Sequence, residues 1–104
     1  MRVYALVDPT TGRIRYVGQT DKTLDWRLAR HISCTKSGAQ APVNRWIVDL
    51  LLKKQRPTIL LLEETDALTA EEDWIDVMVL RNVPILNCHH ATLYTPLDSQ
   101  PSNR

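Results

Sequence analysis

The pattern of apolar and polar positions at the start of the chain predicts two β-strands joined by a short loop. The stretch "VYALVDPTTGRIRYVG" (residues 3–18) places β-rich runs on both sides of residues 8–12, which contain proline and glycine. Such a loop is typical of an antiparallel hairpin. Pairing that is symmetric about the loop puts Tyr4 opposite Tyr16, with both side chains on one face of the sheet.

A helical period begins soon after this hairpin. Leu24, Leu28 and Ile32 recur at helical spacing and predict a helix over about residues 22–32. Arg27 and His31 lie one turn apart, directly beside this apolar stripe. Taken alone, each fits an ordinary border residue whose stem covers apolar surface while its polar end reaches water. Three residues are suited to cap the start of the helix: Thr20, Asp21 and Thr23.

The middle of the chain predicts a second helix and a third strand. Pro42 opens a helical period that continues to Lys54, since proline is favoured in the first turn of a helix. The stretch "RPTILLLEE" (residues 56–64) contains an apolar, β-branched run, which predicts a central strand buried on both faces. The stretch "VPILN" (residues 83–87) predicts a last short strand.

A third helix is predicted from Thr69 onward. Thr69 and Glu72 have the spacing of a capping box, which gives Glu72 a structural task at the helix start. Glu71 instead lies on the face of the apolar stripe formed by Trp74, Ile75 and Met78. A carboxylate at the head of such a stripe is unfavourable unless a cation is near it. A metal ion or an arginine is therefore the expected partner of Glu71.

These elements predict a single small α/β domain of the α+β type. At 104 residues the chain is long enough for one core and too short for two. The expected architecture is a central, mainly antiparallel three-stranded sheet flanked by helices. We expect residues 1–90 to form this domain and residues 91–104, which are polar and contain proline, to be a loosely ordered tail.

Composition argues against a membrane protein and against a secreted disulfide-rich protein. The longest apolar runs are far shorter than a membrane span, and the first residues are too briefly apolar for a signal peptide. Cys34 and Cys88 allow at most one bridge, so both are expected to be free thiols. A cytoplasmic location is expected, or the host-cell interior if the chain is encoded by a phage.

The small net charge of +1 hides a segregation of charge along the chain. Residues 12–56 carry ten basic and three acidic side chains, whereas residues 57–80 carry seven acidic side chains and no Lys or Arg. A molecule of this kind can offer a basic face to a polyanion and carboxylates to a metal. The same counts also fit a solvated surface on which the charges mix in three dimensions.

Five motifs in order resemble the GIY-YIG nuclease family, over roughly residues 3–87. They are Tyr4 on the first strand, Tyr16-Val17-Gly18 on the second, Arg27 and His31 on the next helix, Glu71 on a later helix, and Asn87 after it. The chain departs from the family at Arg2 and Val3, where Gly and Ile are typical. Gln19 also replaces a lysine found in some members, with Lys22 as a candidate substitute.

The resemblance implies an endonuclease that hydrolyses DNA phosphodiester bonds with one divalent ion, Mg²⁺ or Mn²⁺. Glu71 would hold the metal ion, and Arg27 would stabilise the charge on the phosphate. Tyr4 or Tyr16 would act as the base after acidification by nearby cations, with His31 relaying the proton or orienting the hydroxyl. Four residues would support the site or the substrate: Gly18, which makes room for the phosphate, Gln19, Lys22 and Asn87. A single site of this kind cuts one strand, so we expect a monomer or a weak homodimer.

Two other functions fit the sequence. One is a catalytically inactive DNA-binding or protein-binding module on the same scaffold. The other is a structural metal site that uses His31, Cys34, Cys88, His89 and His90. Because three of these residues are adjacent and no Cys-x-x-Cys pair exists, convergence on one tetrahedral ion is difficult.

Overall fold

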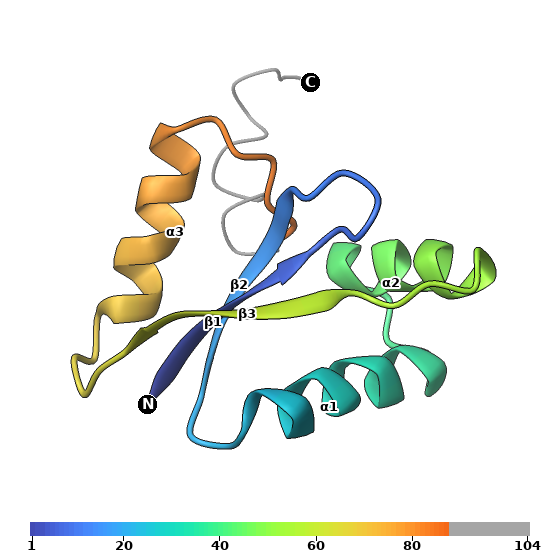
Figure 1. Cartoon of the computed structure of the whole chain (residues 1–104), viewed down its shortest axis with the longest axis horizontal. Coiled ribbons are helices and arrows are strands. Elements are labelled where there is room, and N and C mark those ends of the chain that lie inside the picture. Colours follow the sequence, from blue (N-terminus) through green and yellow to red (C-terminus); the bar gives the residue numbers. More distant parts are fainter. Residues whose placement is uncertain (88–104) are drawn as a thin grey trace.

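The computed structural model describes residues 1–87 of the chain. These residues form three strands and three helices. Figure 1 shows α3 on one side of the sheet and α1 and α2 on the other. In chain order the elements are β1 (Arg2–Val7), β2 (Ile14–Thr20), α1 (Leu24–Lys36), α2 (Pro42–Leu52), β3 (Thr58–Glu64) and α3 (Ala70–Leu80). The strand order is β2-β1-β3 with antiparallel pairing throughout. The predicted α+β class and three-stranded antiparallel sheet are therefore confirmed; residues 91–104, the expected tail, lie outside the described residues.

The central strand is β1, and it is buried on both faces. Its alternating side chains enter two separate apolar clusters, because successive residues of a strand point to opposite faces. Val3 packs with Val17 and with three residues of α3: Ala70, Ile75 and Met78. Tyr4 and Leu6 pack on the other face with Ile32 of α1 and with Val43 and Ile47 of α2. The helices therefore cover β1 from both sides.

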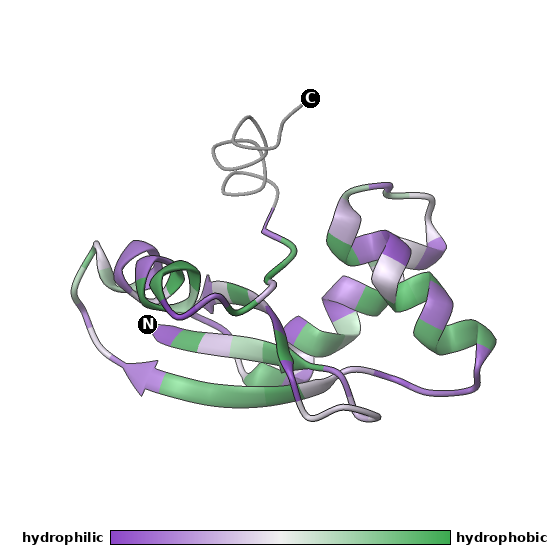
Figure 2. Ribbon diagram, turned by 90° about the horizontal axis from the view of Figure 1, so that it is seen from above, coloured by the Kyte–Doolittle hydropathy of each residue, from purple (hydrophilic) through white to green (hydrophobic). Residues whose placement is uncertain are grey.

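The prediction that residues 56–64 form the central strand is wrong. β3 pairs with β1 alone and lies at the edge of the sheet, and Leu60 and Leu61 keep 49% and 44% of their surface exposed. Figure 2 shows β3 along one margin of the molecule, largely in the colour of hydrophobic residues. An apolar run predicts a strand with apolar neighbours, but it does not tell which strand the helices cover. In this structure the helices pack against the two faces of β1.

The hairpin forms as predicted, but its register differs by two residues. Tyr4 lies opposite Gly18, and Leu6 lies opposite Tyr16, with a register shift between Leu6 and Val7. The difference arises because the loop is one residue longer than expected and the bulge adds another. Since side chains alternate with a period of two, a shift of two leaves both tyrosines on the same face. The predicted shared face is confirmed and the direct pairing is wrong.

The first helix starts and ends slightly later than predicted. Thr23 is its cap, since the Thr23 hydroxyl accepts a hydrogen bond from the Trp26 amide at 3.1 Å. The helix then runs to Lys36, four residues beyond the expected end at Ile32. The second helix begins at Pro42, as predicted.

The predicted capping box of the third helix does not form. Thr69 makes no side-chain cap bond, and its hydroxyl lies 3.2 Å from a carboxylate oxygen of Asp73. The backbone of Thr69 has φ −96° and ψ 0° rather than the extended conformation that a capping box needs. Glu72 is exposed. The helix nevertheless begins next to Thr69, at Ala70.

The predicted last strand at residues 83–87 is also not formed as a strand. This segment instead runs beside β2, where the Leu86 amide donates to the Arg15 carbonyl. The side chain of Asn87, rather than its backbone, then bonds to Val17. One backbone bond of Leu86 and two side-chain bonds of Asn87 thus take the place of the backbone ladder that a further strand would have made.

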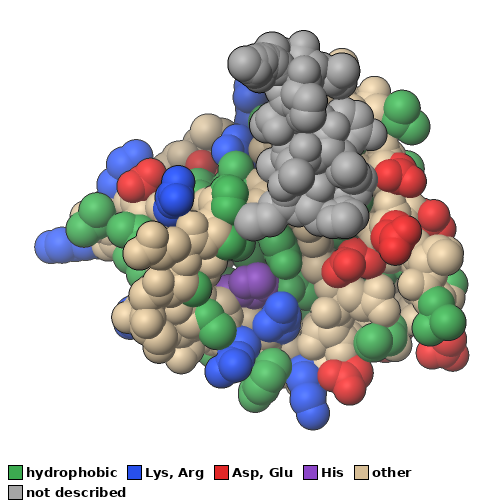
Figure 3. Space-filling model, turned by 180° about the vertical axis from the view of Figure 1, so that it is seen from behind, with side chains coloured by type: hydrophobic (Ala, Val, Ile, Leu, Met, Phe, Trp, Pro, Cys, Tyr) green, Lys and Arg blue, Asp and Glu red, His purple; other side chains and the backbone are tan. Residues whose placement is uncertain are grey.

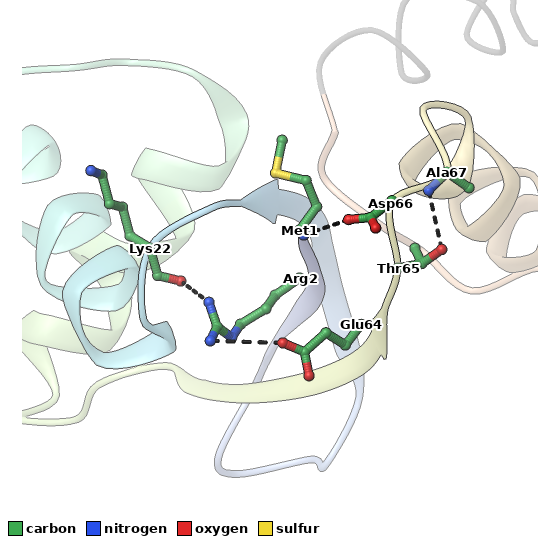
Figure 4. A network of polar contacts seen from close by, with 7 residues as sticks. All are labelled: Met1, Arg2, Lys22, Glu64, Thr65, Asp66 and Ala67. Carbon is green, nitrogen blue, oxygen red and sulfur yellow. Dashed lines mark hydrogen bonds and ion pairs between the residues drawn. The ribbon is translucent and has the colours of Figure 1, made fainter.

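A network of polar contacts around the N-terminus connects the start of β1 with neighbouring segments (Figure 4). The guanidinium of Arg2 donates to the Lys22 carbonyl at 3.1 Å and lies 3.8 Å from a carboxylate oxygen of Glu64. It thereby connects the start of β1 with the loop before α1 and with the end of β3.

None of the helices within residues 1–87 has the length and apolar character needed to cross a bilayer.

Candidate active site

Three of the predicted site residues meet in one hydrogen-bonded chain. The Tyr4 hydroxyl accepts a hydrogen bond from Arg27 Nε at 3.0 Å and lies 2.7 Å from His31 Nε2. The direction of the bond between Tyr4 and His31 depends on the histidine tautomer: an unprotonated Nε2 accepts the phenol proton, and a protonated Nε2 donates to the phenol oxygen. Helical spacing places Arg27 and His31 one turn apart, and β1 delivers Tyr4 between them.

Tyr16 joins this group through ring contacts. Its ring centroid lies 5.2 Å from that of His31, with an interplanar angle of 77°. The rings of Tyr4 and Tyr16 are 6.4 Å apart. Tyr4 has no exposed surface, whereas Tyr16 is half-buried. Of the two tyrosines, Tyr16 is therefore the one that solvent or a substrate can reach.

Burial shifts the pKa values of Tyr4 and His31 in the directions that favour the neutral form of each side chain. Burial, together with the positive charge of Arg27, lowers the pKa of His31 to about 4. Burial and the neighbouring Tyr16 raise the pKa of the Tyr4 phenol well above its usual range, and the opposing effect of Arg27 is smaller. The prediction that cations acidify the tyrosine is thus wrong for Tyr4. Loss of hydration outweighs one nearby charge.

The lowered pKa of His31 predicts a stability loss in mild acid. An unfolded histidine titrates near pH 6.5, so protons bind the unfolded chain first and the folded chain only near pH 4. The contribution of His31 is fully present above about pH 6.5 and declines as the pH falls toward 4. We expect the thermal midpoint of His31→Gln to decline less steeply over this interval than that of the wild type. Equal slopes in the two melting series would contradict the assignment.

Glu71 stands at the start of α3 as a half-buried carboxylate. Burial, and next the charge of Glu72, raise its pKa, while Arg27 acts in the opposite direction. The charge of Glu71 also contributes to the raised pKa of Tyr4, so the carboxylate lies within electrostatic range of the Tyr4 and Arg27 pair. Within residues 1–87, Glu71 forms no hydrogen bond or ion pair. The expected arginine partner is therefore near but not in contact, and the carboxylate remains open to a cation.

Gly18 makes room for Tyr4 rather than for a phosphate. A Cβ built on Gly18 would lie 2.5 Å from Cζ of Tyr4 and nearer still to its hydroxyl oxygen. The Tyr4 phenol thus lies across the backbone of the residue opposite it in the sheet. The space predicted for substrate is filled by the protein itself, and this corrects the role expected for Gly18.

Asn87 supports the second strand. It is buried, and its side chain accepts a hydrogen bond from the Val17 amide at 3.0 Å and donates to the Val17 carbonyl at 2.7 Å. Val17 is adjacent to both Tyr16 and Gly18 in the chain. Asn87 therefore helps to fix the position of β2 next to Tyr16 and Gly18.

Removing this amide should destabilise the protein measurably. Asn87→Ala leaves both Val17 backbone groups buried without a partner, and we expect a loss of about 1–3 kcal/mol in the free energy of unfolding. Asn87→Asp is the matched variant, because it keeps the acceptor but replaces the donor that faces the Val17 carbonyl. Denaturant unfolding measures both. A change of a few tenths of a kcal/mol or less in both variants would show that the Asn87 bonds are dispensable.

The two other predicted supporting residues are not part of the hydrogen-bonded group. Gln19 lies opposite Val3, so alternation directs its side chain to the α3 face rather than to the face of Tyr4. Lys22 is exposed, and Figure 4 shows its side chain directed away from Arg2. Neither side chain forms a hydrogen bond or ion pair within residues 1–87. Both remain available to a ligand.

A buried pair of polar residues behind His31 was not anticipated from the sequence. The Thr35 hydroxyl donates to the His31 carbonyl at 2.8 Å and accepts from Asn44 Nδ2 at 2.9 Å. This chain connects α2 to the turn of α1 that carries His31. The signal was the spacing of four residues between His31 and Thr35, since a threonine in a helix often bonds to the carbonyl four residues earlier.

Comparisons with protein-family models, with curated proteins and with solved structures found no match to this chain. The interpretation of the site therefore depends on its geometry and on the residue types. The structural metal site proposed as an alternative gains no support within residues 1–87, where no group of three or more His, Cys, Asp or Glu is placed to hold an ion. Of its five residues, Cys88, His89 and His90 lie outside the described residues.

The surface around the site is open between α1 and α3. Figure 3 shows a histidine in a hollow of this face, with Lys and Arg side chains beside it and Asp and Glu side chains gathered on the side of α3. The charge segregation seen along the sequence is thus partly kept in space.

Proposed function

We propose that this protein is a divalent-metal-dependent endonuclease that hydrolyses DNA phosphodiester bonds. The observation that carries the proposal is the convergence of Tyr4, Arg27 and His31, with Tyr16 against the His31 ring and Glu71 within electrostatic range. These side chains come from four separate elements. They are also the residues on which the resemblance to GIY-YIG nucleases rests.

Arg27 is the group that would bind the scissile phosphate. Its Nε is engaged by Tyr4, and within residues 1–87 its two terminal amino groups form no hydrogen bond or ion pair. A guanidinium that is held through its Nε keeps both terminal amino groups as further donors. Such donors match the oxygens of a phosphate, and they stabilise the extra negative charge that develops as water attacks phosphorus.

Glu71 is the residue that would hold the divalent ion. One carboxylate with water ligands is a common protein contribution to a Mg²⁺ site, and a half-buried carboxylate with a raised pKa is stabilised by a bound cation. When bound, the ion would neutralise charge on the phosphate and on the leaving 3′ oxygen.

Tyr16 suits the role of base better than Tyr4. Tyr4 is completely buried and its pKa is raised, so it neither meets water nor ionises readily. Its task is to hold Arg27 and to orient His31 through the two hydrogen bonds. Tyr16 is half-buried beside His31. As a tyrosinate it would take a proton from a water molecule while the water oxygen bonds to phosphorus and the P–O3′ bond breaks, and the leaving 3′ oxygen would take a proton from solvent.

The test is nicking of supercoiled plasmid with Mg²⁺, with and without EDTA, by wild type and Arg27→Lys. Lysine keeps the charge but loses the forked donors and the Nε bond to Tyr4. We expect the variant to nick about 100- to 1,000-fold more slowly, while its DNA affinity changes little. Arg30→Lys, on an exposed position of the same helix, should nick at the wild-type rate. Equal losses of binding and turnover in Arg27→Lys would make Arg27 a phosphate anchor only.

The raised pKa of Tyr4 also supports a second function, a catalytically inactive DNA- or protein-binding module on this scaffold. A buried phenol that stays neutral is a structural group in such a module. The plasmid experiment separates the two functions, because DNA binding without metal-dependent nicking would support the module and contradict the nuclease.

A further inference from the structure

Among residues 1–87, no other strand pairs with the outer edge of β3. Within residues 1–87, every backbone ladder of β3 is made with β1. The opposite edge of the sheet differs, since the segment containing Leu86 and Asn87 bonds to the backbone of β2. An open edge offers a row of backbone donors and acceptors to another strand. In the part of the chain that the structure describes, the sheet is thus protected at its β2 edge and open at its β3 edge.

The side chains of β3 fit a neighbour on this edge. Leu60 and Leu61 point to opposite faces of the sheet and are 49% and 44% exposed, whereas Ile59 and Leu62 pack against the two cores. Both exposed leucines lie in residues 58–61, the section of β3 that pairs with β1 in regular register. A strand added at this edge would cover part of both. The edge also has no proline or lysine within Thr58–Glu64, the usual means of blocking it.

The charges at the two ends of β3 determine which strand fits. Basic side chains precede the strand and acidic ones end or follow it, namely Lys53, Lys54 and Arg56 before it and Glu63, Glu64 and Asp66 at or after its end. A second copy placed antiparallel brings the basic end of each strand next to the acidic end of the other. A parallel copy would bring like charges together, which is unfavourable. The strand is therefore complementary to itself in one direction only.

We propose that two copies of this chain pair antiparallel through their β3 edges and form one continuous six-stranded sheet. The pairing has two-fold symmetry with its axis near Leu60, so that Arg56 of each copy lies near Glu64 of the other. Backbone bonds and the leucines supply the affinity, and the exposed charges set the direction. A short edge predicts a weak dimer, with a Kd on the order of 10⁻⁵ M. The dimer does not depend on the proposed nuclease activity.

The experiment uses sedimentation of the full chain over a range of concentrations with two charge-reversal variants. Arg56→Glu places two acidic residues together at each end of the pairing, and Glu64→Arg places two basic ones together. Each variant alone should remain monomeric at concentrations where the wild type dimerises. An equimolar mixture should dimerise again, because every opposed pair then has opposite signs. The recovery cannot come from misfolded protein.

Two control variants reverse one basic and one acidic side chain at positions away from β3. Arg45→Glu on α2 and Asp76→Arg on α3 are both at exposed positions away from β3, and both should dimerise like the wild type. Leu60→Lys should weaken the dimer at least tenfold, whereas Leu52→Lys, at a leucine that is 77% exposed on α2, should not. A wild-type chain that stays monomeric at several hundred micromolar, roughly ten times the expected Kd or more, overturns the proposal. A mixture of Arg56→Glu and Glu64→Arg that remains monomeric overturns the antiparallel pairing.

Discussion

Glu71→Gln should reduce Mg²⁺-dependent nicking by at least about 100- to 1,000-fold, the size expected when several kcal/mol of charge stabilisation is lost. The physical reason is that Gln cannot supply the negative charge that holds the ion. The thermal midpoint at neutral pH should be unchanged or higher. Burial raises the pKa of Glu71, so its stability contribution is present below the usual pKa and is lost as the pH rises through the folded value. Gln avoids that loss.

Glu72→Gln is the matched control, because it makes the same chemical change one residue further along α3. Glu72 is exposed, and the capping box that would have given it a structural role does not form. We therefore expect wild-type nicking and stability. Mg²⁺ should also raise the thermal midpoint of the wild type and of Glu72→Gln but not that of Glu71→Gln. Full activity in both variants would reject the nuclease proposal, and loss in Glu72→Gln alone would move the metal site to Glu72.

Gly18→Ala should be among the most disruptive single substitutions in the sheet. The added methyl group would lie 2.5 Å from Cζ of Tyr4, and Tyr4 has no room to withdraw because it is fully buried and bonded to His31 and Arg27. Overpacking of this kind costs about 1–3 kcal/mol. Nicking should fall as well, since displacement of the phenol releases Arg27.

A double-mutant cycle with Tyr4→Leu distinguishes this clash from a general intolerance of alanine in β2. In the Leu background the methyl group meets a smaller side chain, so Gly18→Ala should cost less by roughly 1 kcal/mol or more. Denaturant unfolding of the four proteins gives the coupling energy. A cost of Gly18→Ala that is independent of residue 4 would mean that Tyr4 is not what excludes a side chain at Gly18.

Several features of the site follow from local spacing and could be predicted. The four-residue interval between Arg27 and His31 places them on one side of a helix wherever that helix packs. The hairpin brings Tyr4 and Tyr16 to the same face even though the predicted register was wrong, because an error of two residues preserves the alternation. Glu71 on the apolar side of α3 follows from the same reasoning, and it is half-buried as expected.

Other features depend on contacts that no local pattern contains. The apolar run of β3 predicted a central strand, yet β1 is central because α3 covers one of its faces and α1 and α2 cover the other. Thr69 and Glu72 have the spacing of a capping box, but the backbone entering α3 has the wrong dihedral angles for it. The role of Gly18 was misassigned because the position of the Tyr4 ring depends on side-chain packing across the hairpin.

The chemistry of the site divides in the same way. Periodicity placed Tyr4, Tyr16, Arg27, His31 and Glu71 on their faces, since it depends on neighbours within a few positions. The resemblance of their order to GIY-YIG nucleases then selected them as candidates. The hydrogen bonds that Tyr4 makes with His31 and Arg27 connect residues 27 and 23 positions apart. The pKa directions of Tyr4 and His31 depend on burial beneath several elements at once. Loss of hydration is a property of the packed molecule, so only the tertiary structure decided that the pKa of the phenol is raised and that of the imidazole is lowered.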